Sequence, residues 1–402
     1  MSEAKAGPLT GIKVIDVAQM LAAPFAAMLL ADFGATVVKI EPPLGDASRR
    51  AGHNIHGTSM WWRLMSRNKF ALTANLKDPR GQELVRRLIA DADVLVDNMR
   101  PGKLEACGLD PVELRKTNPG LIVLRVTGWG QTGPYRDQPA FGSQAEALSG
   151  FTYSNGHPDG KPVLPANPLA DAASGYLGAF SVMVALWARE RDPEKRGQTI
   201  DLSLLESFFH MLGPWATAYT ENGHIMGRLG GRSGVSAPRN IYRSKDDRWV
   251  AVSAATDVTA QRCFAAIGRK EMNRDPRFAT LDARVENIDQ VDAAVQAWIG
   301  THDGAEAVKV LGEAGVPASL IYNIKDIMED PHFKARELVV DAIAEDLGRT
   351  IKMQNVFPRL ELTPGAIQWT GRAQGADNRE WFVGKLGVSS EEFARLIADG
   401  VI

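Results

Sequence analysis

The spacing of apolar and polar residues changes along the first part of the chain, and each change predicts an element. Residues 12–17 alternate with β-branched residues and predict a strand, residues 24–33 are apolar with helical spacing, and residues 36–41 predict a second strand. Gly34 is placed to end the helix. A strand, a helix and a strand within about thirty residues are typical of a βαβ unit in a parallel sheet.

The same pattern continues beyond this unit. Strands are predicted within residues 70–76, 94–99 and 121–130. Asp78 and Pro79 provide an N-cap and a first helical residue for a helix between the first two of them. This half of the chain therefore predicts an α/β fold with a Rossmann-like, doubly wound parallel sheet.

A Gly-rich segment at residues 128–165 predicts a long irregular loop, of a kind that often carries function. It is followed by a predicted helix over 171–190, a strand over 199–204 and a helix over 204–220.

Gly and Pro gather at residues 227–240 and indicate a domain boundary. We therefore expect a large Rossmann-like domain at residues 1–225, which binds the cofactor, and a smaller α+β domain at 226–330. Residues 331–402 form a C-terminal segment that returns to the large domain.

Composition narrows the classes of protein. The chain has 402 residues and a formal net charge of -2, which gives no reason to expect nucleic acid or an anionic membrane as a partner. The apolar run at 179–188 is too short to span a bilayer.

Two cysteines, Cys107 and Cys263, fit a reducing cytoplasm rather than a disulfide scaffold. The histidines and cysteines form no HxxxH or CxxC pattern, so we expect no metal.

The turn after the first strand reads DVAQMLAAP, at residues 16–24. A dinucleotide site would need G-x-G-x-x-G there, because only glycines let the backbone approach a pyrophosphate closely. The sequence therefore argues against an NAD cofactor, although the predicted architecture is similar.

Asp171 is a lone acid in NPLADAASGYLG, at residues 167–178. As an ordinary structural residue it would be a helix N-cap. As a functional residue it would be a reactive carboxylate, kept ionised by the helix dipole. Its small neighbours (Ala172, Ala173, Gly175 and Gly178) would allow close approach by neighbouring backbone or by a ligand.

Ordered motifs along nearly the whole chain resemble those of the class III CoA-transferases, the CaiB/BaiF type that includes formyl-CoA and carnitine CoA-transferases. The motifs are the stretch at residues 8–46, RNK at 67–69, VLVDNMRPGKLEACGL at 94–109, GWGQTGPY at 128–135, PLADAASGY at 168–176, KRGQTIDLSLLES at 195–207, DPRFATLDARVEN at 275–287, DPHFKARELV at 330–339 and PRLELTPG at 358–365. The resemblance implies two domains in a ring-shaped chain and a homodimer whose two rings interlock.

The resemblance also implies a reaction. Asp171 would attack an acyl-CoA, and CoA would pass to a free carboxylic acid through an aspartyl anhydride and an aspartyl-CoA thioester. Both intermediates hydrolyse, so water must be excluded. GGRSG at 230–234 could be a mobile lid or a plain hinge between domains. Glu146 is either a solvated helix residue or a second candidate catalytic acid, which would orient Asp171 or the substrate. Some related sequences also carry an acid at this position, whereas sequences like formyl-CoA transferase place an acid at the position of Gly142 instead.

Cations and backbone amides should gather around the phosphates of CoA. The positions that match CoA contacts of the family are Leu21, Ala22, Asn75, Leu76, Lys77, Asn98, Met99 and Arg100. Lys39, Arg67 and Lys69 could also contact phosphate or could be solvated surface charges. Some members of the family carry arginines where this chain has Pro42 and Ala106, and Arg100 could compensate.

Other functions stay open at this stage. An α-methylacyl-CoA racemase of the same superfamily would place a histidine where this chain has Phe141. A CoA-dependent lyase and a non-catalytic CoA-binding protein are further alternatives. Trp61 and Trp62 could line an acyl pocket or belong to the core, and the sequence does not indicate which acids are exchanged.

Overall fold

The computed structural model describes residues 7–402 and divides into two compact units. The first unit contains the chain up to Phe151, Leu164–Pro214 and Arg336–Ile402; the second contains Thr152–Val163 and Trp215–Ala335. The second unit thus begins about ten residues earlier than the sequence predicts and takes in a short piece of the Gly-rich segment. The predicted helix over 204–220 is broken at Gly213 and Pro214, and this break is where the chain leaves the first unit.

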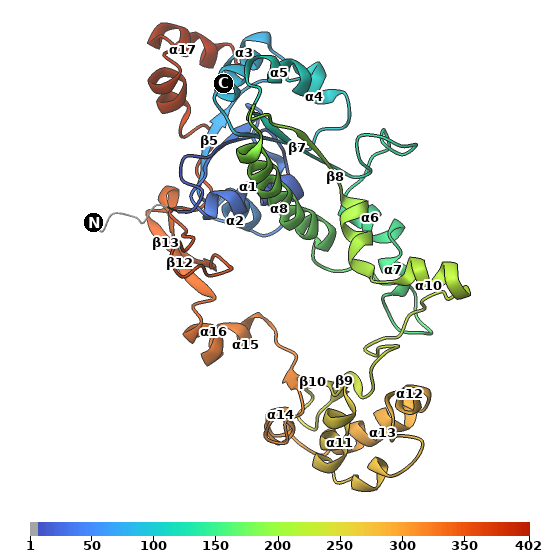
Figure 1. Cartoon of the computed structure of the whole chain (residues 1–402). Coiled ribbons are helices and arrows are strands. Elements are labelled where there is room, and N and C mark those ends of the chain that lie inside the picture. Colours follow the sequence, from blue (N-terminus) through green and yellow to red (C-terminus); the bar gives the residue numbers. More distant parts are fainter. Residues whose placement is uncertain (1–6) are drawn as a thin grey trace. The chain divides into compact units, whose positions relative to one another are not determined.

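A six-stranded parallel sheet forms the centre of the first unit (Figure 1). Its strands are β1 (Lys13–Asp16), β2 (Thr36–Glu41), β5 (Lys69–Thr73), β6 (Val94–Asp97), β7 (Ile122–Thr127) and β8 (Thr199–Ser203). Their order is β5-β2-β1-β6-β7-β8, so the chain adds three strands in one direction and then returns to add three in the other. This is the doubly wound order that the βαβ pattern predicts.

Alternate residues of these strands enter two different cores. Val14, Val37 and Val94 belong to one buried cluster, whereas Ile15 and Val38, one residue later, belong to the other. Because side chains alternate across a strand, both faces of the sheet are covered, as is usual for parallel sheets.

Helices cover each face. The first cluster includes α1 (Ala22–Asp32), α6 (Gly142–Leu148), α8 (Leu169–Arg191) and α9 (Leu204–Phe209). The second includes α3 (Pro79–Ile89), α4 (Lys103–Ala106), α5 (Pro111–Thr117), a π-helical segment (Arg379–Lys385) and α17 (Ser390–Ala398). The C-terminal segment thus supplies part of the core of the first unit.

Shorter elements complete this unit. They are α2 (Met60–Met65), 3-10 turns at Ala47–Arg49, His210–Leu212 and Glu345–Leu347, and the antiparallel pairs β3 (Asn54–Ile55) with β4 (Thr58–Ser59) and β12 (Val339–Ala344) with β13 (Arg349–Gln354). Helix α7 (Phe151–Ser154) begins at the last residue of this segment of the first unit, and its other residues belong to the second unit. The prediction of a wholly irregular segment at 128–165 is wrong, because α6 and α7 form within it. Phe141 is the N-cap residue of α6, and its amide donates to Gln144 Oε1 at 2.9 Å.

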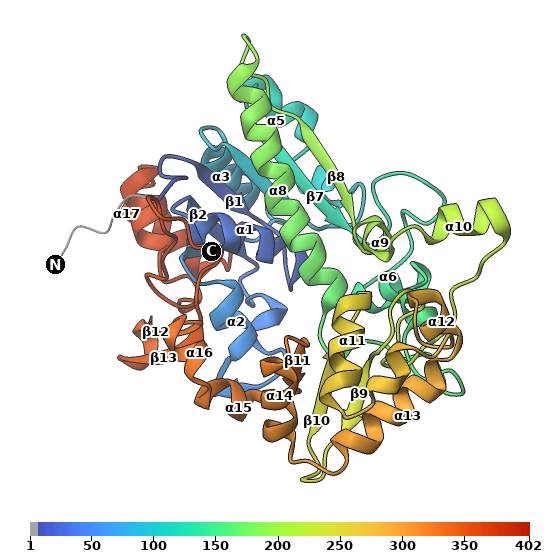
Figure 2. The same cartoon turned by 60° about the horizontal axis from the view of Figure 1, so that its bottom comes forward.

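Helices α1 and α8 lie side by side in both views (Figures 1 and 2). A β-carbon added to Gly175 would come within 2.5 Å of the Phe25 ring, and one added to Gly178 within 3.1 Å of the Ala26 β-carbon. These two glycines therefore serve helix packing. The close approach of a neighbour that the sequence predicts at these two positions is thus made by α1 rather than by a ligand.

Within the described residues, α8 is long and apolar enough to cross a membrane when judged by length and composition alone. The apolar run at 179–188 lies within this 23-residue helix, as the predicted helix over 171–190 implies. The core helix of a soluble protein passes the same test, so the observation is weak evidence.

The second unit has its own sheet and core. Strands β9 (Arg239–Arg243), β10 (Trp249–Ser253) and β11 (Ala318–Leu320) form an antiparallel sheet in the order β11-β10-β9. The helices are α10 (Trp215–Asn222), α11 (Asp257–Ala266), α12 (Leu281–Glu286), α13 (Ile288–Ile299), α14 (Gly304–Glu313), α15 (Ile324–Glu329) and α16 (Pro331–Ala335), with a 3-10 turn at Lys270–Asn273. The core joins α11, α13 and α14 to this sheet.

Candidate active site

The order of strands in the parallel sheet reverses between β1 and β6. In doubly wound sheets, ligands bind beyond the carboxyl ends of the strands at such a reversal, because the loops on its two sides diverge and leave a crevice. A pocket of about 350 Å³ lies at this place. It is lined by Val17, Gln19, Met20, Leu21, Ala22, Asn98, Met99, Arg100, Val126, Thr127, Gly128, Ala140, Phe141, Asp171 and Leu204.

The pocket brings together six of the ten residues that the sequence predicts for the site. They are Leu21, Ala22, Asn98, Met99, Arg100 and Asp171. They come from three segments that are far apart in the chain, after β1, after β6 and at the start of α8. Gln19, Met20 and Thr127 also line the pocket and were not predicted. Their position at or just after the carboxyl end of a parallel strand is a signal that could have indicated them.

Asn75, Leu76 and Lys77 do not line this pocket. They follow β5, which is the edge strand of the sheet. The amide of Asn75 donates to the carbonyl of Val401, and its Oδ1 accepts from the amide of Lys77 at 3.0 Å. Their contact with CoA stays a prediction.

Asp171 lies in the first turn of α8 and is half-buried. The N-cap position of this helix is Pro168, so Asp171 is not the N-cap that the structural interpretation predicts. Burial, followed by the negative charge of Glu146, raises the pKa of Asp171 to about 6. The position in the first helical turn therefore does not lower the pKa, because burial and the like charge outweigh the helix dipole.

Gly142, the first residue of α6, lies against this carboxylate. A β-carbon on Gly142 would come within 2.5 Å of Asp171 Oδ2 and 3.2 Å of Asp171 Cγ. A side chain at this position would force the carboxylate to move. The position at which related sequences carry an acid is therefore in direct contact with Asp171.

Glu146 lies one turn further along α6 and is only 3% exposed. Its Oε1 accepts a hydrogen bond of 3.1 Å from the amide of Ala170, the residue before Asp171. Because Pro168 gives α8 no side-chain cap, Glu146 satisfies an amide of the first helical turn from another helix. Glu146 thus both holds the start of α8 and acts electrostatically on Asp171.

Phe141 lines the same pocket and is 71% exposed. It is the position at which a racemase of this superfamily would place its histidine, and no histidine lines this pocket. Proton abstraction next to a carbonyl needs a base within hydrogen-bond reach. In this pocket the acid–base chemistry would have to come from Asp171.

Three further cations that the sequence offers as possible phosphate contacts are paired with carboxylates inside the protein. Lys69 Nζ lies 2.8 Å from Asp16 Oδ2, Lys39 Nζ lies 3.0 Å from Asp46 Oδ2, and Arg67 binds Asp32 through both Nε and an Nη nitrogen. All three cations are less than 5% exposed. They are neither solvated surface charges nor phosphate ligands, because internal carboxylates satisfy them.

Arg100 differs from these cations because it is exposed at the pocket. No ion pair of Arg100 is found within residues 7–402. An exposed guanidinium beside the crevice is suited to bind a phosphate group.

The Gly-rich segment at 230–234 belongs to the second unit and is held there by several bonds. The amide of Gly230 donates to the carbonyl of Gly156, Arg239 donates to the carbonyls of Gly231 and Arg232, and Arg232 binds Asp289 and Asp292. A role as lid or as hinge stays a prediction.

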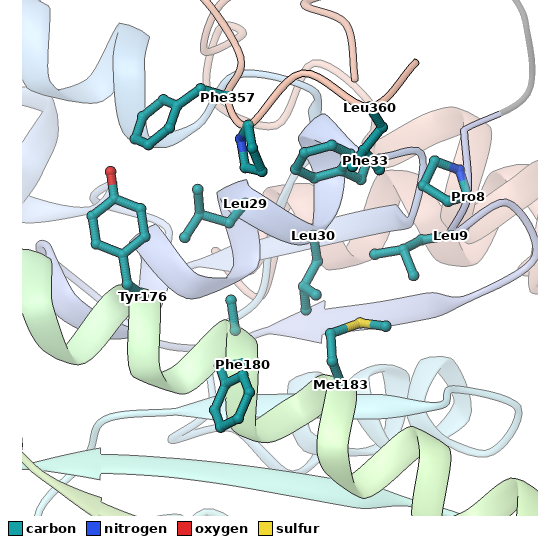
Figure 3. A pocket seen from close by; sticks show the side chains of 12 residues that line it. Pro8, Leu9, Leu29, Leu30, Phe33, Tyr176, Phe180, Met183, Phe357 and Leu360 are labelled. Atoms are coloured by element: carbon teal, nitrogen blue, oxygen red, sulfur yellow. The ribbon is translucent and has the colours of Figure 1, made fainter. Parts of the chain in front are cut away.

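A second cavity of the first unit, of about 430 Å³, is lined almost wholly by apolar side chains. Figure 3 shows Tyr176, Phe180 and Met183 of α8 on one side of it and Leu30 and Phe33 on another. Without a nucleophile or cation, this groove does not suit the chemistry of an acyl-CoA. Among the described residues, no group of three or more His, Cys, Asp or Glu side chains could hold a metal ion.

Comparisons with known proteins agree with the motifs. The model of CoA-transferase family III matches residues 9–378. The succinyl-CoA–D-citramalate CoA-transferase of Chloroflexus aurantiacus is 41% identical over 397 residues, which cover 98% of each chain. The beta subunit of the succinyl-CoA–L-malate CoA-transferase of the same organism is 40% identical, again over 98% of each chain.

Among solved structures, a CAIB/BAIF family protein from Brucella suis superposes with a TM-score of 0.83 at 28% identity. The match covers 94% of this chain and all of that one. With a family match over nearly the whole sequence and relatives at 40% identity, the chain is an enzyme that belongs to CoA-transferase family III.

Proposed function

We propose that the enzyme transfers CoA from an acyl-CoA donor to a free carboxylic acid, with Asp171 as the nucleophile. The observation that carries this proposal is the position of Asp171 in the crevice at the strand reversal, together with Arg100 and the loop after β1. A carboxylate with a pKa of about 6 is roughly nine-tenths ionised at pH 7, yet it is a stronger nucleophile than one of ordinary pKa.

The reaction then consists of four substitutions at carbonyl carbons. An oxygen of Asp171 attacks the donor thioester, the C–S bond breaks and CoA leaves as a thiolate, giving a mixed anhydride. The thiolate attacks the aspartyl carbonyl, and the donor acid leaves as a carboxylate. The acceptor carboxylate attacks the resulting aspartyl-CoA thioester and releases the thiolate. The thiolate attacks the acceptor carbonyl, which restores Asp171. No proton or electron is gained or lost.

Glu146 would support these steps without touching the substrate. Its hydrogen bond to the amide of Ala170 holds the start of α8, and its negative charge destabilises the ionised carboxylate of Asp171, which raises the pKa of Asp171. The result is a nucleophile fixed in position and raised in basicity.

The bound ligand would be CoA or acyl-CoA, without NAD or a metal. Arg100 would bind a phosphate group, and the amides at the start of α1, beside Leu21 and Ala22, would face another. The names of the two Chloroflexus relatives support succinyl-CoA as the first donor to test, with citramalate and malate as acceptors.

We further propose an interlocked homodimer in the cytoplasm. Phe180, Val184 and Trp187 lie on one face of α8 and are 65%, 50% and 61% exposed. Phe180 also lines the apolar groove of Figure 3, so exposed apolar side chains and an apolar groove adjoin on α8, which supports burial against a second copy.

The experiment that tests the proposed function is a matrix of acyl-CoA donors against free carboxylic acids, with the products identified by mass. Transfer of CoA to at least one acid is expected, and it should vanish when Asp171 is replaced by Asn. Binding of CoA with no transfer to any acid would support the non-catalytic alternative.

A further inference from the structure

The loop between β1 and α1 forms one wall of the pocket, and a side chain from another loop holds it. Asn98 Oδ1 accepts a hydrogen bond from the amide of Gln19 at 2.9 Å, and Asn98 Nδ2 donates to the carbonyl of Gln19 at 2.7 Å. Asn98 follows β6, so this pair of bonds joins the two loops on either side of the strand reversal. Both polar atoms of the side chain are used within the protein.

The next residue, Met20, has an unusual backbone. Its φ is +65°, in the left-handed region that side chains other than glycine rarely adopt. The amide of Met20 donates to Asp46 Oδ1 at 3.3 Å. Asp46 is 1% exposed and is held by Lys39, whose ammonium also donates to the carbonyl of Ala18. Neighbours therefore fix the loop on both sides of the strained residue.

We propose that Asn98 is a positioning residue of the CoA site, whose side chain holds Gln19 and Met20 in the shape that CoA binds. This inference rests on the proposed function, in which this crevice takes CoA. Without the two bonds, Met20 relaxes toward an ordinary backbone conformation and takes Leu21 and Ala22 with it. Binding of CoA must then reorder the loop, so affinity falls, whereas the reaction of bound substrate changes less.

Calorimetry with CoA and steady-state kinetics test this. In Asn98→Ala we expect the Kd for CoA and the KM for acyl-CoA to rise about tenfold, with kcat changed by less than about threefold. Adding Met20→Gly to Asn98→Ala should recover much of the affinity, because glycine adopts the left-handed backbone without strain. A side chain that binds CoA directly would not be replaced by this second change.

Asn118→Ala is the matched control. Asn118 also joins two segments of the chain, because its Nδ2 donates to the carbonyls of Ile89 at 3.0 Å and Ala92 at 2.7 Å. It precedes β7, so it lies at the amino ends of the strands, away from the pocket at their carboxyl ends. This variant should lose stability and keep the affinity of the wild type for CoA. Should Asn98→Ala fail to fold, Asn98→Asp keeps the acceptor for Gln19 and loses the donor.

Hydrogen exchange provides a readout that needs no ligand. Amides of residues 17–22 should exchange faster in Asn98→Ala than in the wild type or in Asn118→Ala. Unchanged exchange together with unchanged CoA affinity would overturn the inference. So would lost affinity with unchanged exchange and no recovery from Met20→Gly, since Asn98 would then contact CoA itself. A wild-type protein that binds no CoA would refute the proposed function instead, while the exchange rates would still test the role of Asn98.

Discussion

Gly142 and Asp171 lie so close together that no side chain fits between them: a β-carbon on Gly142 would come within 2.5 Å of Asp171 Oδ2. The start of α6 therefore sets the position of the carboxylate at the start of α8. Glu146 on the same helix accepts a hydrogen bond from the amide of Ala170. Two residues of α6, Gly142 and Glu146, therefore position the carboxylate of Asp171.

Gly142→Ala should displace the Asp171 carboxylate. We expect kcat to fall by about a hundredfold, because a nucleophile moved by about 1 Å loses its alignment, and the free energy of unfolding to fall by about 1–3 kcal/mol. Gly312→Ala is the control, since Gly312 lies within α14 and a β-carbon there meets nothing within 4 Å. Wild-type kinetics in Gly142→Ala would show that the carboxylate tolerates displacement.

Asp171→Asn keeps the shape of the side chain and removes the nucleophile. Transfer should fall by several orders of magnitude while CoA binding stays near normal. Asp171 is not the N-cap of α8, and burial destabilises its ionised form. Above pH 6 the free energy of unfolding of the variant should therefore be at least as large as that of the wild type. Near-full activity would refute the mechanism.

Trapping identifies the acylated residue directly. The wild-type enzyme with acyl-CoA and hydroxylamine should be modified at Asp171, because an activated aspartyl carbonyl reacts with that amine. Peptide mass mapping would locate the adduct. An adduct on Glu146 would show that Glu146, and not Asp171, is the nucleophile.

The pH dependence should report the raised pKa of Asp171. The ionised form attacks, so kcat/KM should rise with pH through a midpoint of about 6. In Glu146→Gln the amide oxygen can still accept from Ala170, but the negative charge is gone, so the midpoint should move to lower pH. Glu146→Ala, which removes the hydrogen bond as well, should also lower kcat. An unmoved midpoint in Glu146→Gln would show that burial alone raises this pKa.

Proton exchange separates transferase from racemase chemistry. With Phe141 at the pocket in place of a histidine, a 2-methylacyl-CoA in heavy water should incorporate little deuterium at its α-carbon. Mass spectrometry of the recovered thioester measures this. Rapid exchange without an acceptor acid would favour the racemase alternative.

The apolar face of α8 should be needed for dimerisation. Phe180→Asp combined with Trp187→Asp should reduce the mass measured by light scattering from a dimer toward a monomer or cause aggregation. Val112→Asp is the control, since Val112 is 61% exposed on α5, on the other face of the sheet. A wild-type monomer at micromolar concentration would contradict the proposed dimer.

The sequence by itself predicted the class of fold and proposed Asp171 as the candidate nucleophile. Short runs rich in β-branched and aliphatic residues predict β1, β2 and β6, because a strand buried on both faces needs such residues along most of its length. The missing glycines after β1 argued against a dinucleotide, and the motif around Asp171 indicated the nucleophile. Strand patterns, turn composition and short motifs are local properties, so they can be identified from short stretches of sequence.

Only the tertiary structure decided what lies beside Asp171 and what each neighbour does. Gly142 and Asp171 are 29 positions apart, so no local pattern relates them. The sequence allows a ligand to approach the glycines of α8, but in the structure α1 fills that space. The sequence also allows Lys39 and Lys69 to be surface cations, but in the structure Asp46 and Asp16 pair with them. Asn98 was predicted as a ligand of CoA, yet its side chain binds the backbone of Gln19. Each role depends on a residue distant in the sequence that comes close only when the chain folds, and a single sequence does not show which distant residues will be in contact.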